Sequence, residues 1–435
     1  DRLTVAGRAD AHAHLRDYFA AVPTPERVQT LDDLAPVIEL YHHTVRAEQL
    51  DEAATLFRDR LTNPLYFQFG AYQSCIELLR ALFPDPSTSL RASSEDSLPR
   101  LKDESAQAWT LNTLAASYSL SGQPRQAVPL VEGYIAISEK RGDKTNLAIG
   151  LGNVAQQQLV IGALRAAEAN LRRSIALCRE IEDAFQEAIG HQELGRLLAY
   201  RGAWDEADDE LATAEAVVDK YGPSQTNYVS VVQAYRALRA LLMHRAAPSL
   251  TLPQRGREGV GVEAAQRALE LADETARTQY PVVRDYVDAH WLLGAAYRVS
   301  GDLDAADRHL SEALTRCRGI NMVDHEADIL LELAKLRKMQ EAGSRTEGDA
   351  PSESCIVHPE SFAEAKRLAD EALVITERAG YVLQGADVHL FLAQLALEAG
   401  DRAGALEHAR QAHTLATCDG EPYVYRVALD EAKAM

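Results

Sequence analysis

Hydrophobic residues in the middle of the chain recur at the spacing i, i+3, i+4, i+7, which places them on one face of an α-helix. In residues 188–220, one such stretch ends at Gly202 and a second begins directly after it. Residues 287–318 repeat this arrangement around Gly301. Glycine permits the left-handed backbone that ends a helix. The pattern therefore predicts pairs of amphipathic helices joined by a tight turn.

These predicted helical pairs recur at regular intervals. A turn glycine followed five residues later by an alanine occurs at Gly122, Gly162, Gly202, Gly301 and Gly400. The spacings between these glycines are 40, 40, 99 and 99 residues, and 99 is two periods of 40 plus 19 further residues. Self-similarity at a period of about 20 to 50 residues indicates a solenoid of stacked repeats.

The repeats resemble the tetratricopeptide repeat, whose motif has leucine and glycine in the first helix, glycine at the turn and small residues in the second helix. One copy reads Leu194, Gly195, Gly202, Ala207, Leu211 and Ala214, and another reads Leu293, Gly294, Tyr297, Gly301, Ala306, Leu310 and Ala313. Tyr134 and Gln158 depart from the motif. The resemblance implies an all-α, right-handed superhelix, or solenoid, of helical hairpins. The period of about 40 exceeds the usual period of about 34, so we expect helices about one turn longer than usual.

Segments rich in proline, glycine and serine interrupt this array, near residues 84–100, 246–262 and 341–360. The second and third of these inserts split a repeat, so that the helices expected at 228–245 and 262–280, and at 326–340 and 361–379, form pairs. We interpret the inserts as exposed loops, with ligand binding as the alternative. We expect the repeat array to cover residues 31–420. Residues 421–435 are expected to form a helix that caps the last apolar face.

The segment before the repeats, residues 10–19, reads DAHAHLRDYF. It is similar to the D-x-H-P-L-V-R-E-x-F stretch that joins the winged-helix part of STAND-type signalling ATPases to their carboxy-terminal repeats. Asp10, His12, Arg16 and Phe19 match, whereas Ala13 departs. The resemblance implies that residues 1–30 are a linker from an upstream winged-helix and ATPase region in a bacterial protein, and that the repeats sense a ligand. The absence of an initiator methionine agrees with a piece of a longer protein.

Charge and composition narrow the classes of partner. The net charge is −20, which disfavours binding to a phosphate backbone, so we expect no nucleic-acid partner. The charge favours either a basic partner or simply solubility. No run of 18 apolar residues occurs, so we expect no membrane partner. The five cysteines are scattered without a C-x-x-C motif, which is typical of reduced thiols and indicates a cytoplasmic protein.

Motifs for catalysis are absent or out of context. The sequence contains no phosphate-binding loop, so an ATPase would belong to an upstream module. Residues 150–155 match G-x-G-x-x-A, but they lie inside a predicted helix with no strand before it. His12 and His14 form a His-x-His pair without further metal ligands, and Cys355 and His358 are near neighbours without an orienting group. We therefore predict no enzymatic activity, no cofactor and no metal.

What remains is a recognition surface. In the tetratricopeptide family, the first helices of the hairpins line the concave face, and side chains just off the buried stripe point there. By that register the ligand-binding residues are Trp109, Asn112, Asn153, Gln156, Gln192, Arg196, Arg236, Trp291 and Arg298. Asparagine, glutamine and arginine hydrogen-bond a peptide backbone or a carboxylate. The two tryptophans are either ligand anchors or packing residues between repeats. The predicted partner is a protein or peptide, and the alternative to a STAND sensor is a free-standing scaffold or co-chaperone adaptor that binds peptide tails.

Overall fold

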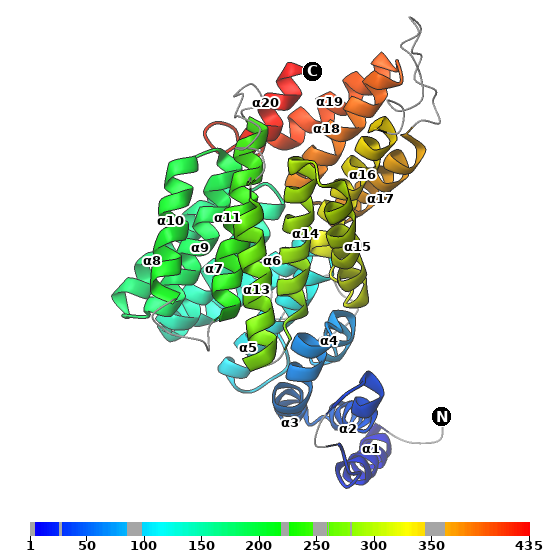
Figure 1. Cartoon of the computed structure of the whole chain (residues 1–435). Coiled ribbons are helices and arrows are strands. Elements are labelled where there is room, and N and C mark those ends of the chain that lie inside the picture. Colours follow the sequence, from blue (N-terminus) through cyan, green and yellow to red (C-terminus); the bar gives the residue numbers. More distant parts are fainter. Residues whose placement is uncertain are drawn as a thin grey trace, which may run out of the picture. The chain divides into compact units, whose positions relative to one another are not determined.

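The structure is a computed structural model that describes residues 5–25, 28–84, 98–218, 226–246, 259, 261–278, 281–343 and 362–435. In these ranges the chain forms helices and no strand (Figure 1). The predicted all-α fold of helical hairpins is confirmed. The inserts expected near 84–100, 246–262 and 341–360 lie largely outside the described residues, as do Cys355 and His358.

The chain divides into two compact units, Asp1–Gly150 and Leu151–Met435. The first unit contains α1 (Val5–Ala20), α2 (Ala35–Arg46), α3 (Leu50–Leu56), α4 (Tyr72–Arg80), α5 (Glu104–Leu120) and α6 (Pro124–Arg141), together with the short helices η1 (Leu31–Leu34), η2 (Phe57–Leu61) and η3 (Asn63–Gln68). Helix α7 (Lys144–Val160) spans the division between the units.

The second unit continues with helices alone. They are α8 (Leu164–Glu180), α9 (Ala184–Arg201), α10 (Trp204–Val218), α11 (Thr226–Ala246), α13 (Val262–Thr278), α14 (Val283–Ser300), α15 (Leu303–Gly319), α16 (Val323–Gly343), α17 (Ala363–Ala379), α18 (Val382–Glu398), α19 (Arg402–Thr417) and α20 (Arg426–Ala434). Both split repeats form as predicted, because α11 packs on α13 and α16 packs on α17.

Small residues let the two helices of a hairpin approach closely. A Cβ atom added at Gly195 in α9 would lie 2.7 Å from Leu211 Cγ in α10, and one at Gly294 would lie 2.6 Å from Leu310 Cγ. Neither distance leaves room for a methyl group. Gly202 ends α9 with φ of 77°, in the left-handed region that glycine adopts without strain. The repeated glycines of the sequence thus set the spacing within a hairpin and the turn that ends its first helix.

The segment from Asp10 to Phe19 lies in α1, which packs against α2 in the first unit. The ring of His43 stacks on the ring of His12, with centroids 5.1 Å apart, and on the ring of Phe19 at 5.5 Å. His14 bonds the carbonyl of Asp10 through Nδ1 at 2.8 Å. The two histidines of the His-x-His pair therefore have separate partners. The proposed role of residues 1–30 as a linker stays a prediction.

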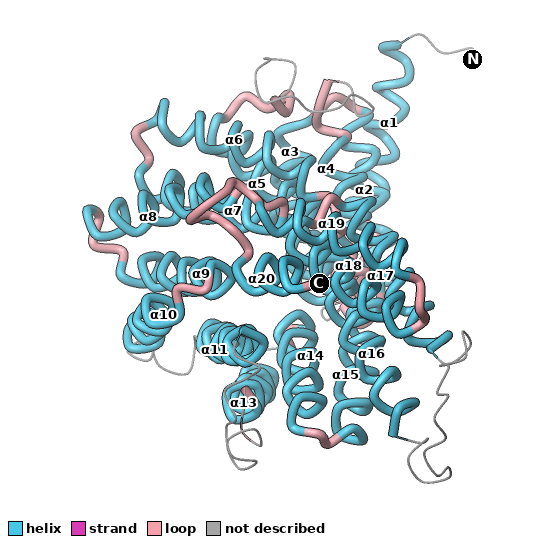
Figure 2. Tube along the Cα trace, turned by 90° about the horizontal axis from the view of Figure 1, so that it is seen from above, coloured by secondary structure: helices cyan, strands magenta, loops and turns pink. Residues whose placement is uncertain are grey.

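Helix α20 does more than cover the last hairpin. It contacts α9, α11 and α18 as well as α19, and Figure 2 shows it lying between α9 and α18. Tyr425, Val427 and Ala428 are buried, and they share one hydrophobic core with residues of α9, α11 and α18. The end of the chain therefore packs against helices that precede it by about two hundred residues, within the second unit.

Candidate functional site

The first helices of successive hairpins in the second unit form a continuous inner layer. Helix α9 contacts α11, α11 contacts α14, α14 contacts α16 and α16 contacts α18. Polar side chains from these five helices meet one another across this layer. We call this set of side chains the inner surface, and its contacts fall into three groups.

The first group centres on Arg196 of α9. Its Nη1 donates to the hydroxyl of Tyr235 in α11 at 3.2 Å, and its guanidinium lies over the Tyr235 ring, 5.2 Å from the centroid. The Tyr235 hydroxyl donates in turn to Glu193 Oε1 at 3.0 Å. Burial opposes the charge on Arg196, but Tyr235 and Glu193 hold the pKa of Arg196 above its usual value. This cation is therefore committed to partners within the protein.

The second group, which we call the acidic cluster, comprises Asp288, Asp324, His325, Asp328 and Gln384. His325 Nε2 lies 3.1 Å from Asp288 Oδ1, and His325 Nδ1 lies 3.1 Å from Asp324 Oδ2. Gln384 Nε2 donates to Asp328 Oδ2 at 3.4 Å. Burial opposes the charge on the imidazole, but Asp324 and Asp288 raise the pKa of His325 to about 9. Burial raises the pKa of Asp328 to about 7, helped by Asp387 and opposed by His325.

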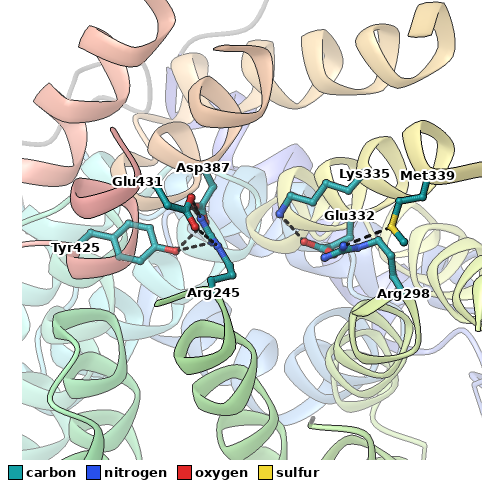
Figure 3. Close-up of polar contacts among 8 residues, drawn as sticks. All are labelled: Arg245, Arg298, Glu332, Lys335, Met339, Asp387, Tyr425 and Glu431. Carbon is teal, nitrogen blue, oxygen red and sulfur yellow. Dashed lines mark hydrogen bonds and ion pairs between the residues drawn. The ribbon is translucent and has the colours of Figure 1, made fainter. Parts of the chain in front are cut away.

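The third group consists of two arginines paired with carboxylates, both drawn in Figure 3. Arg298 Nε donates to Glu332 Oε2 at 2.7 Å, and Lys335 Nζ donates to Glu332 Oε1 at 2.7 Å. Burial alone would raise the pKa of Glu332, but Arg298 and Lys335 lower it to about 2. Met339 Sδ lies 4.0 Å from Nη1 of Arg298.

The other arginine, Arg245 of α11, joins α18 to α20. Its Nη2 donates to Asp387 Oδ1 and to Glu431 Oε2, both at 2.9 Å, and its Nη1 donates to the Tyr425 hydroxyl at 3.2 Å (Figure 3). The Tyr425 hydroxyl donates to Asp387 Oδ2 at 2.9 Å. Although burial opposes it, Asp387 and Tyr425 raise the pKa of Arg245 well above its usual value. This network holds α20 against the inner layer.

Comparison with known proteins places the fold. No family model matches the chain, and no curated protein matches it. The Rap conjugation gene regulator of the plasmid pLS20, solved in complex with the Phr* peptide, is 12% identical and has a TM-score of 0.53, with 94% of each chain covered. The fold is that of tetratricopeptide-type helical repeat proteins.

Two further solved structures match with lower TM-scores. A Rap protein complexed with competence and sporulation factor is 15% identical, with a TM-score of 0.47, covering 86% of this chain and 98% of that one. A STAND protein with a tetratricopeptide repeat sensor from Pyrococcus horikoshii is 14% identical with a TM-score of 0.41. That match covers 98% of this chain, which spans only 54% of the archaeal protein.

In this tetratricopeptide-type array, two of the predicted binding residues belong to the first unit. Trp109 and Asn112 of α5 line a cavity of about 340 Å³ together with Tyr134, Arg141 and Asn146. The half-buried Trp109 ring packs edge-to-face with the Phe57 ring, with centroids 6.2 Å apart. Trp109 therefore packs against a neighbouring element and also faces a cavity.

The other predicted residues belong to the second unit. Arg196, Trp291 and Arg298 lie on the inner surface, and the Trp291 ring packs edge-on against His325 with centroids 5.5 Å apart. Gln192 is buried and donates to Glu193 at 3.2 Å. Arg236 instead pairs with Glu215 of α10 at 2.7 Å, so it leaves the inner surface for the second helix of a hairpin. Asn153 and Gln156 of α7 are half-buried. A ligand-binding role for all of these residues stays a prediction.

The sequence analysis missed several residues that the structure places on the inner surface. Tyr235, His325, Asp328, Gln384 and Asp387 all contact or face another first helix. His325, Asp328 and Glu332 are spaced by three and four residues along α16, so extending the same helical register to α16 and α18 identifies them. In the part of the chain that the structure describes, no group of three or more His, Cys, Asp or Glu side chains is placed to hold a metal ion. No described helix combines the length and apolar character needed to cross a membrane.

Proposed function

We propose that this chain is a recognition domain whose ligand is a protein or peptide bound along the inner surface of the second unit. The observation that carries the proposal is the row of polar side chains on five successive first helices. Solvent reaches these side chains: Arg196, Asp387 and Arg245, for example, are 14%, 14% and 24% exposed. A row of this kind offers donors and acceptors at repeated intervals, which suits an extended chain with a repeating backbone.

The fold supports the same proposal. The Rap regulator of pLS20, which shares it, was solved with a peptide bound. In a repeat array each repeat packs against its neighbours along the stacking direction, so the inner faces of the first helices are available to a long ligand. The site requires no cofactor for recognition, and we propose none.

Peptide display against the full chain tests this function. Peptides selected on the wild type are then measured on two matched double variants by fluorescence polarisation. The first, Trp291→Ala with Met339→Ala, alters accessible side chains of the inner-surface helices α14 and α16. The second, Val374→Ala with Leu406→Ala, alters exposed side chains of the second helices α17 and α19. We expect the first variant to weaken binding at least about tenfold, or roughly 1.4 kcal/mol, and the second to leave it unchanged. Equal affinity of both variants for all selected peptides rejects the inner surface as the binding site.

We further propose that the domain is the cytoplasmic sensor of a bacterial STAND-type ATPase. The support is the match of Asp10, His12, Arg16 and Phe19 to the segment that joins winged-helix and repeat regions in that family. The test is the reading frame that encodes this chain. An in-frame phosphate-binding loop upstream supports the proposal, whereas its absence favours a free-standing scaffold. The isolated chain should release no phosphate from ATP, because its sequence has no phosphate-binding loop.

A further inference from the structure

The acidic cluster has more carboxyl groups than cations. Asp288, Asp324 and Asp328 share one histidine, His325, whose two ring nitrogens face Asp288 and Asp324. Asp328 has the carboxamide of Gln384 as its hydrogen-bond donor. The arginines around the cluster have partners of their own, because Arg196 binds Tyr235 and Arg245 binds Asp387. Arg284, which opposes the rise that burial causes in the pKa of the neighbouring Asp288, lies 3.8 Å from Asp285. The cluster therefore carries a surplus of negative charge at a site where burial makes that charge costly.

Acceptor atoms in the cluster also lack donors. Gln384 is 6% exposed, and its Nε2 donates to Asp328, so its carboxamide lies in the cluster. Its Oε1 has no hydrogen-bond partner among the described residues, and neither has Asp324 Oδ1. Buried acceptors without partners are rare and costly. Both atoms would be satisfied by a ligand that brings N–H groups.

An aromatic side chain stands beside these acceptors. Trp291 of α14 packs against the His325 ring, and its Nε1 has no hydrogen-bond partner within the described residues. An indole face attracts a cation, and an indole N–H donates to a carbonyl oxygen. Asp288, Asp324 and His325 are 12%, 19% and 18% exposed, so solvent reaches the cluster. A charged group can therefore approach the exposed edge of the cluster from the inner surface, whereas Gln384 Oε1 and Asp324 Oδ1 are covered and have to turn toward the ligand.

We propose that the acidic cluster, together with Trp291, binds a guanidinium group, and that the peptide recognised by the inner surface carries an arginine at this point. The inference rests on the proposed function and adds the chemical class of one ligand residue. A guanidinium presents five N–H donors in one plane, which matches acceptors supplied by α14, α16 and α18. An ammonium group has three donors on a single centre and spans fewer of these acceptors.

Fluorescence polarisation with the full chain tests the inference. The probe is a labelled nonapeptide with two arginines among glycines and serines, and the matched probe has citrulline in place of arginine. Citrulline keeps the shape of arginine but has no charge. We expect the arginine probe to bind at least about tenfold more tightly than the citrulline probe. Spermidine, a cation that is not a peptide, is the competitor, and we expect it to displace the arginine probe poorly. Equal binding of both probes, or displacement by spermidine as efficient as by unlabelled arginine peptide, overturns the inference.

Two double variants, each replacing two aspartates and compared at pH 8, where Asp328 is largely ionised, locate the binding. Asp288→Asn with Asp328→Asn neutralises the cluster, and Asp209→Asn with Asp304→Asn neutralises two exposed carboxylates on α10 and α15. We expect the first to weaken the arginine probe at least about tenfold and the second to change it less than about twofold. Similar losses in both would mean diffuse attraction to an acidic protein and would refute the site. If circular dichroism shows that the cluster variant is unfolded, Gln384→Leu, which alters no charge, provides a separate check. This variant should lower the affinity for the arginine probe several-fold.

The pH dependence gives an independent readout. A bound cation favours ionised Asp328, whose pKa of about 7 reflects burial, the facing Asp387 and the opposing groups His325, Gln384 and Arg196. The arginine probe should therefore bind about tenfold more tightly at pH 8 than at pH 6, while His325, with a pKa of about 9, stays charged. Asp328→Asn should flatten this profile, and an unchanged profile counts against the inference. If displayed peptides without arginine bind the inner surface, the inference fails while the proposed function stands.

Discussion

Replacing Arg245 tests how the end of the chain is held against the inner layer. Arg245→Met keeps the length of the side chain but removes the cation that joins α11 to Asp387 of α18 and Glu431 of α20. Among the described residues, both carboxylates then lose their only ion-pair partner, and the Tyr425 hydroxyl loses a donor. The change therefore removes more than one contact from a single site.

The expected magnitude follows from burial. Breaking a buried ion pair by removing one partner costs about 3–5 kcal/mol. The side chains of Arg245, Asp387 and Glu431 are 24%, 14% and 31% exposed, so solvent compensates for part of this loss. We expect a loss of about 2–3 kcal/mol. Because the loss falls on the contacts of α20, this helix should open locally before the rest of the second unit.

Hydrogen exchange followed by mass spectrometry measures this opening. Amides of α20 should exchange about 30- to 150-fold faster in Arg245→Met, which corresponds to the expected free energy, while amides of the α14–α15 hairpin should keep their protection. Arg267→Met is the matched control, because Arg267 is 52% exposed and, among the residues that the structure describes, pairs with Glu270 alone, on its own helix. The control should change stability by less than about 0.5 kcal/mol.

A triple variant tests the mechanism. Adding Asp387→Asn and Glu431→Gln to Arg245→Met removes the carboxylates that the single variant leaves unpaired, so it should recover most of the protection of α20. The reasoning is refuted if α20 exchanges in Arg245→Met as it does in the wild type. It is also refuted if Arg267→Met accelerates exchange in α20 as much as Arg245→Met does.

Three further predictions concern stability. Ala207 and Ala306 are wholly buried at the helix crossings of their hairpins, so Ala207→Leu and Ala306→Leu should each destabilise by about 1–3 kcal/mol in thermal melts; unchanged melting temperatures in both would show that the register is wrong. Arg298 and Lys335 hold the pKa of Glu332 at about 2 against the effect of burial. The contribution of ionised Glu332 to stability is therefore present at neutral pH and is lost as the pH falls from about 4.5 to about 2. Glu332→Gln should make the urea unfolding midpoint depend less on pH over that range. Burial, and after it His309, lowers the pKa of His290 to about 4. As the pH falls below about 6.5, this histidine is therefore protonated in the unfolded chain before it is protonated in the folded one, which destabilises the fold. His290→Gln should reduce the decrease in the free energy of urea unfolding between about pH 7 and pH 5, and an unchanged decrease would show that this histidine does not contribute.

The hairpins were predictable because their signals are local. Gly195 and Gly294 recur 99 residues apart, and each lies directly against a leucine of its partner helix. Gly202 and Gly301 end the first helices with positive φ in both copies. A repeating motif of this kind encodes the contact between two consecutive helices, so it needs no knowledge of the rest of the chain.

It is harder to predict from the sequence which side chains of a first helix face the inner layer, because a helix turns about 100° per residue. Arg236 was assigned to the concave face, but it pairs with Glu215 of α10, while its neighbour Tyr235 reaches Arg196 and Glu193 across the inner layer. A step of one residue along the helix thus separates the inner surface from the flank of the helix. No sequence pattern indicates that α20 packs against α11, because Arg245 and Glu431 are 186 residues apart and belong to no common repeat.

The pattern of pairing changes which residues should be tested as ligand contacts. Arg196 and Arg298 were predicted to bind the ligand, yet each already has partners within the inner surface. Arg196 contacts the Tyr235 hydroxyl and the Glu193 carboxylate. Arg298 binds the Glu332 carboxylate, which also accepts a hydrogen bond from Lys335. Reversing their charge would place like charges beside Glu193 and Glu332 and would damage the fold, so a loss of binding in such variants would not identify a contact. The acceptors of Asp324 and Gln384, by contrast, still lack a partner in the described structure. Recognition is therefore better examined at the carboxylates, where neutral substitutions remove a charge that the fold itself disfavours.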